Sequence, residues 1–145
     1  MSSDPAAAKQ LSAGVVVVHC MKGEYYFLLL RAYNYWDFPK GLLEPGEAPF
    51  AAARREAKEE ASLEHLEFRW GDEYFETPAY GRGKIARYYI AHSLTTDVTL
   101  PVSPELGRPE HHEYRWVDYE SATHLLNERV RAALDWARAR IGERC

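Results

Sequence analysis

The sequence contains little cysteine and no long apolar run, and these absences exclude several classes of protein. Two cysteines among 145 residues, Cys20 and Cys145, are too few for the disulfide framework of a small secreted domain, so we expect two reduced thiols. No apolar run approaches the roughly 18 to 20 residues of a membrane-spanning helix. The opening MSSDPAAAKQ lacks the charged start and apolar middle of a signal peptide. We therefore predict a cytoplasmic protein with no membrane partner.

An excess of positive charge is also missing. The formal net charge is −4, whereas proteins that hold nucleic acid without sequence preference carry a basic surface. This balance argues against nucleic acid as a partner. It does not exclude small anionic substrates, which a few cations and metal ions can hold. No oligomeric state follows from the composition.

The patterns that are present indicate one α/β domain. The length suits a single domain, which we place at residues 13–145 after a flexible tail at 1–12. Apolar and β-branched runs predict strands at 13–20, 25–31, within 66–76, at 84–93 and at 112–118. Helical patterns cover 48–62 and, as one or two helices, 119–141. Proline and glycine predict turns or loops over 32–46 and 94–112. Together these elements predict a mixed sheet flanked by helices.

The predicted helix at 48–62 carries an unusual cluster of acidic residues. Glu56, Glu59 and Glu60 fall at i, i+3 and i+4, so they share one face. Like charges at this spacing repel by a few tenths of a kcal/mol each when exposed. Concentrated carboxylate oxygens are the ligands that Mg²⁺ or Mn²⁺ prefers. The alternative is a solvated acidic face whose partners are the cations of the same helix, Arg54, Arg55 and Lys58.

The surrounding residues favour the metal site, because the segment resembles the signature of the Nudix hydrolase family. That signature is a glycine, five residues, a glutamate, seven residues, and then Arg-Glu-apolar-x-Glu-Glu-x-Gly-apolar. The matching positions are Gly41, Glu47, Arg55, Glu56, Ala57, Glu59, Glu60 and Leu63. Ser62 stands where the family has glycine, which suits a left-handed residue at a helix end. Serine there is expected to cost about 1 kcal/mol or to alter the exit of the chain.

The resemblance implies a Nudix-type sheet sandwiched between helices and a loop-helix-loop that holds a divalent cation against a diphosphate. It implies metal ligands at Glu56, Glu59 and Glu60. It also implies that Glu47 and Arg55 form a supporting pair, and that Gly41 permits a tight turn before the helix. A cation at such a site stabilises charge on the phosphoryl oxygens and acidifies water for in-line attack on phosphorus.

Three segments outside the signature resemble asymmetrical diadenosine tetraphosphate hydrolases. In YWDFPKGLLEPGE (35–47), Lys40 is placed to hold a phosphate, or else it is a solvated loop lysine. In GKIARYYIA (83–91), Tyr88 takes the position of a base-stacking tyrosine, or else it is a core residue. In EHHEYRWV (110–117), Glu110 takes the position of a glutamate near the metals, which makes it a candidate ligand and, with Glu59 and Glu60, a catalytic candidate. His111 and His112 are expected to support the site or to be exposed.

The resemblance therefore implies a nucleotide as the small-molecule partner and Mg²⁺ or Mn²⁺ as cofactor. The favoured reaction is asymmetrical cleavage of diadenosine tetraphosphate to ATP and AMP. Alternatives are another Nudix pyrophosphatase, acting on nucleoside triphosphates, ADP-ribose, RNA 5′ ends or inositol polyphosphates, and a noncatalytic nucleotide-sensing module. A sensing module is expected to lack one or more of the metal-binding glutamates, and this chain has all three.

Overall fold

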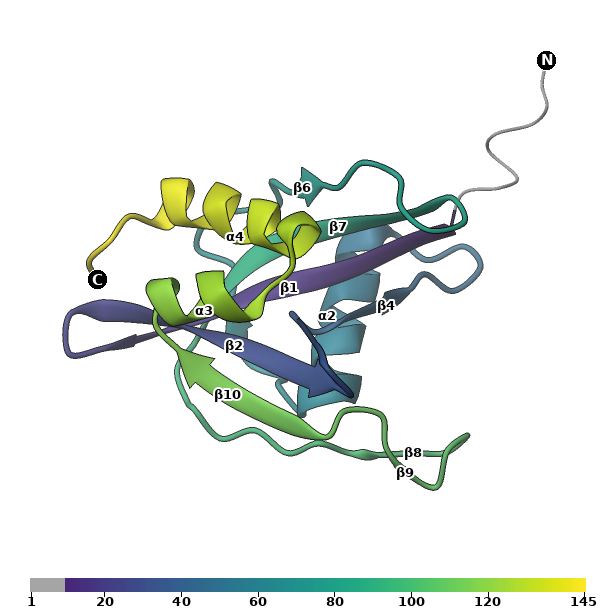
Figure 1. Ribbon diagram of the computed structural model, residues 1–145. Helices are drawn as coiled ribbons and strands as arrows, with labels where there is room; N and C mark the ends of the chain where they lie inside the picture. Colours follow the sequence, from purple (N-terminus) through teal and green to yellow (C-terminus); the bar gives the residue numbers. More distant parts are fainter. Residues whose placement is uncertain (1–9) are drawn as a thin grey trace, which may run out of the picture.

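The computed structural model describes residues 10–145 and contains one large mixed sheet (Figure 1). Its first strand begins at Gln10, so residues 10–12, predicted to belong to a tail, are part of the sheet. They are ordered by two partners at once, because Gln10 pairs with Lys84 on one side and Ser12 pairs with Leu42 on the other. Residues 1–9 of the predicted tail lie outside the described part of the chain.

The large sheet has eight strands, with the order β10-β2-β1-β7-β5, and the short strands β3, β4 and β6 pair with β2, β1 and β7. Its members are β1 (Gln10–Met21), β2 (Glu24–Ala32), β3 (Tyr35–Asp37), β4 (Lys40–Leu42), β5 (Leu66–Glu67), β6 (Phe75–Glu76), β7 (Lys84–Ser93) and β10 (Glu113–Val117). The central strands β1 and β7 are parallel, and every other pair in this sheet is antiparallel. The predicted mixed sheet is confirmed.

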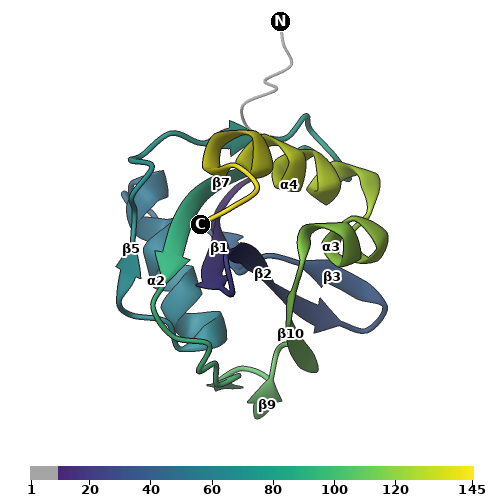
Figure 2. The ribbon, with the colours of Figure 1, turned by 90° about the vertical axis from the view of Figure 1, so that its left-hand side faces the viewer.

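Helices cover both faces of this sheet, as predicted. The helix α2 (Pro49–Ala61) packs on one face, and α3 (Tyr119–Leu125) and α4 (Glu128–Ile141) pack on the other (Figure 2). Alternation along β1 supplies both cores, because Val15 and Val17 face the alanines of α2 whereas Val16 and Val18 face α4. Among the helices of residues 10–145, none has the length and apolarity needed to cross a bilayer.

The two segments predicted to be turns or loops contain short strands. Residues 32–46 include β3 and β4, and residues 94–112 include β8 (Val102–Ser103) and β9 (Arg108–Pro109), which form a separate hairpin (Figure 1). Each of these strands is two or three residues long, and a proline or glycine lies within or close to each of them. Such strands carry too few residues to show an alternating pattern in the sequence.

The helix α2 ends at the residue where the sequence departs from the family signature. Ser62 adopts the left-handed conformation, with φ of 61°, and its N–H donates to the Lys58 carbonyl. Its Oγ donates to the Thr99 carbonyl at 3.0 Å. The chain therefore leaves the helix in the conformation that glycine would adopt, and the serine hydroxyl offsets part of the backbone strain by fastening the helix end to a neighbouring loop.

The structure joins Cys20 to Cys145 in a disulfide bond, with Cα atoms 5.9 Å apart. The expectation of two free thiols is therefore wrong, because folding brings the chain's last segment back to the β1–β2 turn. There the Cys145 N–H donates to the Gly23 carbonyl, and the backbone of Arg144 forms an isolated antiparallel β-bridge with Glu24. The cytoplasmic location, which rested partly on reduced cysteines, stays a prediction.

Cys145→Ser is expected to lower the free energy of unfolding by about 2 to 5 kcal/mol, because the bond closes a loop with a sequence separation of 125 residues. Urea titration with and without reductant measures the effect. Reductant should destabilise the original chain by a similar amount and leave the variant unchanged. Equal stability of the two proteins without reductant would show that the bond does not restrain the unfolded chain in solution.

Candidate functional site

The predicted glutamate face of α2 lies beside β4, and its members differ in exposure. Glu56 and Glu60 are buried, at 8% and 9% exposed, whereas the Glu59 side chain is 55% exposed. A solvated acidic face would expose all three. The alternative considered from the sequence is therefore excluded for Glu56 and Glu60, which lie in a cleft.

Gly41 makes room for one of these carboxylates. Gly41 belongs to β4, where it pairs with Ala13 of β1, and it does not form the predicted tight turn. A Cβ added to Gly41 would lie 2.1 Å from Cδ of Glu56 and 2.3 to 2.4 Å from its two carboxylate oxygens. Glycine is therefore needed at this position for close approach, because any side chain would displace Glu56.

Arg55 connects the loop before α2 to the acidic face. Its Nε and Nη2 donate to the two carboxylate oxygens of Glu47 at 2.8 and 2.9 Å, and Nη2 also donates to the Leu42 carbonyl. Its Nη1 donates to one oxygen each of Glu56 and Glu59, at 2.8 and 3.0 Å. The hydrogen bonds that Arg55 donates to Glu47 are the main reason why the pKa of Glu47 is lowered to about 2. Arg55 thus orients two carboxylates and leaves each of them a second oxygen for a ligand.

Glu60 meets two residues that are far away in the sequence. Atoms of Glu60, Glu110 and His111 that could bind a metal all lie within 4.8 Å of one another. The resemblance implied Glu110 as a ligand, whereas His111 was expected to support the site or to be exposed. The segment 110–111 follows the β8–β9 hairpin, so this hairpin determines how the cluster forms.

The carboxylates of the cleft have perturbed acidity. Burial, and next the charges of Glu110 and Glu56, raise the pKa of Glu60 well above its ordinary value. Burial also raises the pKa of Glu56, although the Arg55 charge opposes this effect. Crowded, desolvated carboxylates are stabilised by a cation that neutralises them. The donor atoms and their spacing therefore fit a divalent cation.

Cations line the other side of the same cleft, which has a volume of about 920 Å³. Lys40 lies there, with its N–H donating to Glu60 Oε1 at 3.1 Å and its Nζ 3.8 Å from Asp37. Burial is the largest single influence and lowers the pKa of Lys40, but the electrostatic effects of Asp37, Tyr80, Tyr35 and Glu60 together raise this pKa above its ordinary value. Other residues that line this side are Tyr35, Tyr80, Lys84 and Arg129. The cleft thus offers carboxylates at one end and positive charge at the other.

The base-stacking role predicted for Tyr88 is not supported by its position. Tyr88 is 0% exposed, packs edge-to-face on Phe38, and donates its hydroxyl to Asp37 Oδ1 at 2.9 Å. It is therefore the core residue of the alternative interpretation, and its hydroxyl helps to hold Asp37 beside Lys40. The aromatic rings that do line the cleft belong to Tyr35 and Tyr80.

The cleft also contains residues that the sequence did not single out. Arg129, in the first turn of α4, places its guanidinium carbon 3.8 Å from the centre of the Tyr80 ring and donates to the Tyr35 hydroxyl. Lys84 begins β7. These residues come from separate elements, and no local motif links them, so only the assembled fold brings them together.

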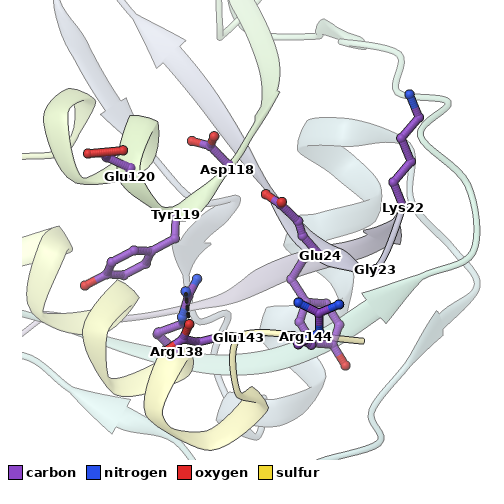
Figure 3. Close-up of a pocket in the computed structure, with 10 residues that line it drawn as sticks. Lys22, Gly23, Glu24, Asp118, Tyr119, Glu120, Arg138, Glu143 and Arg144 are labelled. Carbon is purple, nitrogen blue, oxygen red and sulfur yellow. Dashed lines mark ion pairs between the residues drawn. The ribbon is translucent and has the colours of Figure 1, made fainter.

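A second hollow, of about 730 Å³, lies between the β1–β2 turn, the start of α3 and the last turns of the chain (Figure 3). Its lining mixes both charges, and Arg138 pairs with Glu143 across 3.8 Å within it. Asp118 caps α3 by accepting from the Ser121 N–H. This second hollow contains none of the signature residues, so the glutamate cleft is the candidate active site.

Comparison with known proteins identifies the family of this chain over most of its length. The NUDIX domain model matches residues 8–137. Bis(5′-nucleosyl)-tetraphosphatase [asymmetrical] of Caenorhabditis elegans is 32% identical over 122 residues, covering 80% of this chain and 84% of that protein. RNA pyrophosphohydrolase of Pelagibacter ubique is 28% identical, covering 86% and 87%. The crystal structure of a C. elegans Ap4A hydrolase binary complex superimposes with a TM-score of 0.76, at 28% identity, covering 90% of this chain and 96% of that one.

Proposed function

Since the chain belongs to the NUDIX family of pyrophosphohydrolases, we propose that its glutamate cleft cuts dinucleoside polyphosphates asymmetrically with a divalent cation. The observation that carries this proposal is the division of one cleft into a carboxylate end and a cationic, aromatic end. A phosphate chain with a base at one end has complementary chemistry. The similarity to asymmetrical tetraphosphatases at 32% identity supports the choice of substrate.

Each part of the cleft has a separate task in this proposal. Glu56, Glu59, Glu60 and Glu110 hold the cation. When bound, the cation supplies Lewis acidity, which stabilises charge on the phosphoryl oxygens and acidifies water. Arg55 orients Glu56 and Glu59, while Lys40 binds the phosphate chain. Tyr35 and Tyr80, with Arg129, provide a surface against which one base packs.

Anchoring the substrate at one end keeps one phosphorus in line with the attacking water, so cleavage is expected at a single position. Diadenosine tetraphosphate with Mg²⁺ or Mn²⁺ should give ATP and AMP, and chelator should stop the reaction. In ¹⁸O-labelled water, the label should enter only one of the two products. Chromatography with mass spectrometry measures both results.

Several outcomes would contradict the proposal in different ways. Two equal ADP products would overturn asymmetrical cleavage. Hydrolysis of ADP-ribose, nucleoside triphosphates or triphosphorylated RNA without action on the dinucleotide would transfer the assignment to another pyrophosphatase, of which the RNA-acting relative is one example. Tight nucleotide binding with no turnover in any metal would favour a sensing module.

A further inference from the structure

His111 is a half-buried histidine beside the acidic residues of the site. Its side chain is 12% exposed, and neither ring nitrogen has a hydrogen-bond partner among residues 10–145. It lines a hollow of about 640 Å³ that shares Glu60 and Glu110 with the cleft described above. Because neither ring nitrogen is engaged by residues 10–145, the imidazole is free to bind a ligand.

The imidazole lies close to Glu60, one of the two buried carboxylates of the site. Nε2 of His111 lies 4.0 Å from Oε1 of Glu60, too far for a hydrogen bond and suitable for two ligands of one ion. Oε1 of Glu60 accepts from the Lys40 N–H, whereas its other oxygen has no hydrogen bond within the described chain. The adjacent Glu110 adds a further oxygen within the same 4.8 Å limit.

Building on the metal-dependent hydrolysis proposed above, we propose that His111 coordinates the divalent cation through an imidazole nitrogen, beside carboxylate oxygens of Glu60 and Glu110. The donor set then mixes nitrogen with oxygen. Carboxylate oxygens alone suit Mg²⁺, whereas imidazole favours Co²⁺, Ni²⁺ and Zn²⁺. His111 therefore broadens the ion preference of the site and ties the segment after the β8–β9 hairpin to α2.

Electron spin-echo spectroscopy of the protein with one equivalent of Mn²⁺, without nucleotide, tests this coordination. The original chain should show modulation from a directly bound imidazole ¹⁴N, and ¹⁵N-histidine labelling should change the pattern. His111→Gln should remove the modulation. It should also lower the ratio of Co²⁺ affinity to Mg²⁺ affinity, measured by calorimetry, by at least about tenfold.

His112→Gln is the matched control, because His112 is the next residue but is exposed and accepts from the Tyr33 N–H. This variant should keep the modulation and the affinity ratio. If Mn²⁺ binds, if this binding is lost when Glu60 is replaced, and if the spectrum shows no nitrogen modulation, coordination by His111 is overturned. The proposed hydrolysis is then left intact. The measurement on the original chain gives this result even if His111→Gln does not fold. Absence of Mn²⁺ binding would overturn both proposals.

Discussion

Glu60→Gln is expected to lower kcat by at least about a hundredfold while the protein stays folded. Glu60 lies on α2, its carboxylate accepts a hydrogen bond from the Lys40 N–H, and it lies next to Glu110 and His111. Glutamine keeps its shape and can accept from the Lys40 N–H, but it removes the negative charge that a divalent cation needs. Because burial raises the pKa of Glu60, the charged form is held at a cost, so the neutral amide should not lower the melting temperature.

Steady-state kinetics at saturating Mn²⁺ and thermal unfolding followed by circular dichroism measure the two parts of this prediction. Glu64→Gln is the control, since Glu64 lies just beyond the same helix, is exposed, and pairs with Lys58 at 3.4 Å. It should retain normal kcat and normal stability. Full activity of Glu60→Gln would remove Glu60 from the catalytic site.

Arg55→Ala is expected to lower both kcat and the melting temperature, the latter by at least about 5 °C. The substitution removes the two hydrogen bonds that Arg55 donates to Glu47 and the one that it donates to the Leu42 carbonyl. It also releases Glu56 and Glu59, so the ligand oxygens lose their orientation. Arg55→Lys should recover only part of either property, because one ammonium group cannot reproduce the paired contacts of a guanidinium.

The neighbouring arginine provides the control for this experiment. Arg54 is exposed and lies 6.0 Å from the ring centres of Phe50 and Phe68, with no contact to the glutamate face. Arg54→Ala should therefore change kcat little. If Arg55→Ala lost activity with unchanged stability, Arg55 would belong among the groups that bind substrate and not among those that support the ligands.

The features that local spacing determines were predictable from the sequence. The face of α2 follows from the i, i+3, i+4 positions of its glutamates. The pair of Arg55 with Glu47 was implied by the resemblance to the Nudix signature, and the two side chains are hydrogen-bonded. The sheet follows from apolar runs long enough to show a pattern. Lys40 precedes Gly41, and Gly41 lies directly against the Glu56 carboxylate. Lys40 is therefore held beside the cleft.

The features that depend on distant contacts were not predictable in the same way. Tyr88 and Tyr89 point to opposite faces of β7, and both are buried because helices cover both faces, so the sequence pattern could not show which ring is accessible. His111 reaches Glu60 only because the β8–β9 hairpin returns the chain toward α2. The disulfide likewise depends on where α4 ends relative to the β1–β2 turn.

That disulfide changes the covalent topology of the chain. With Cys20 joined to Cys145, all residues between them form a closed ring. A protease that cuts once inside this ring, for instance in the exposed stretch 104–108, opens the ring but releases no fragment. The cut protein should migrate as a single species without reductant and separate into two pieces with it. Limited proteolysis followed only under non-reducing conditions would therefore miss such cuts.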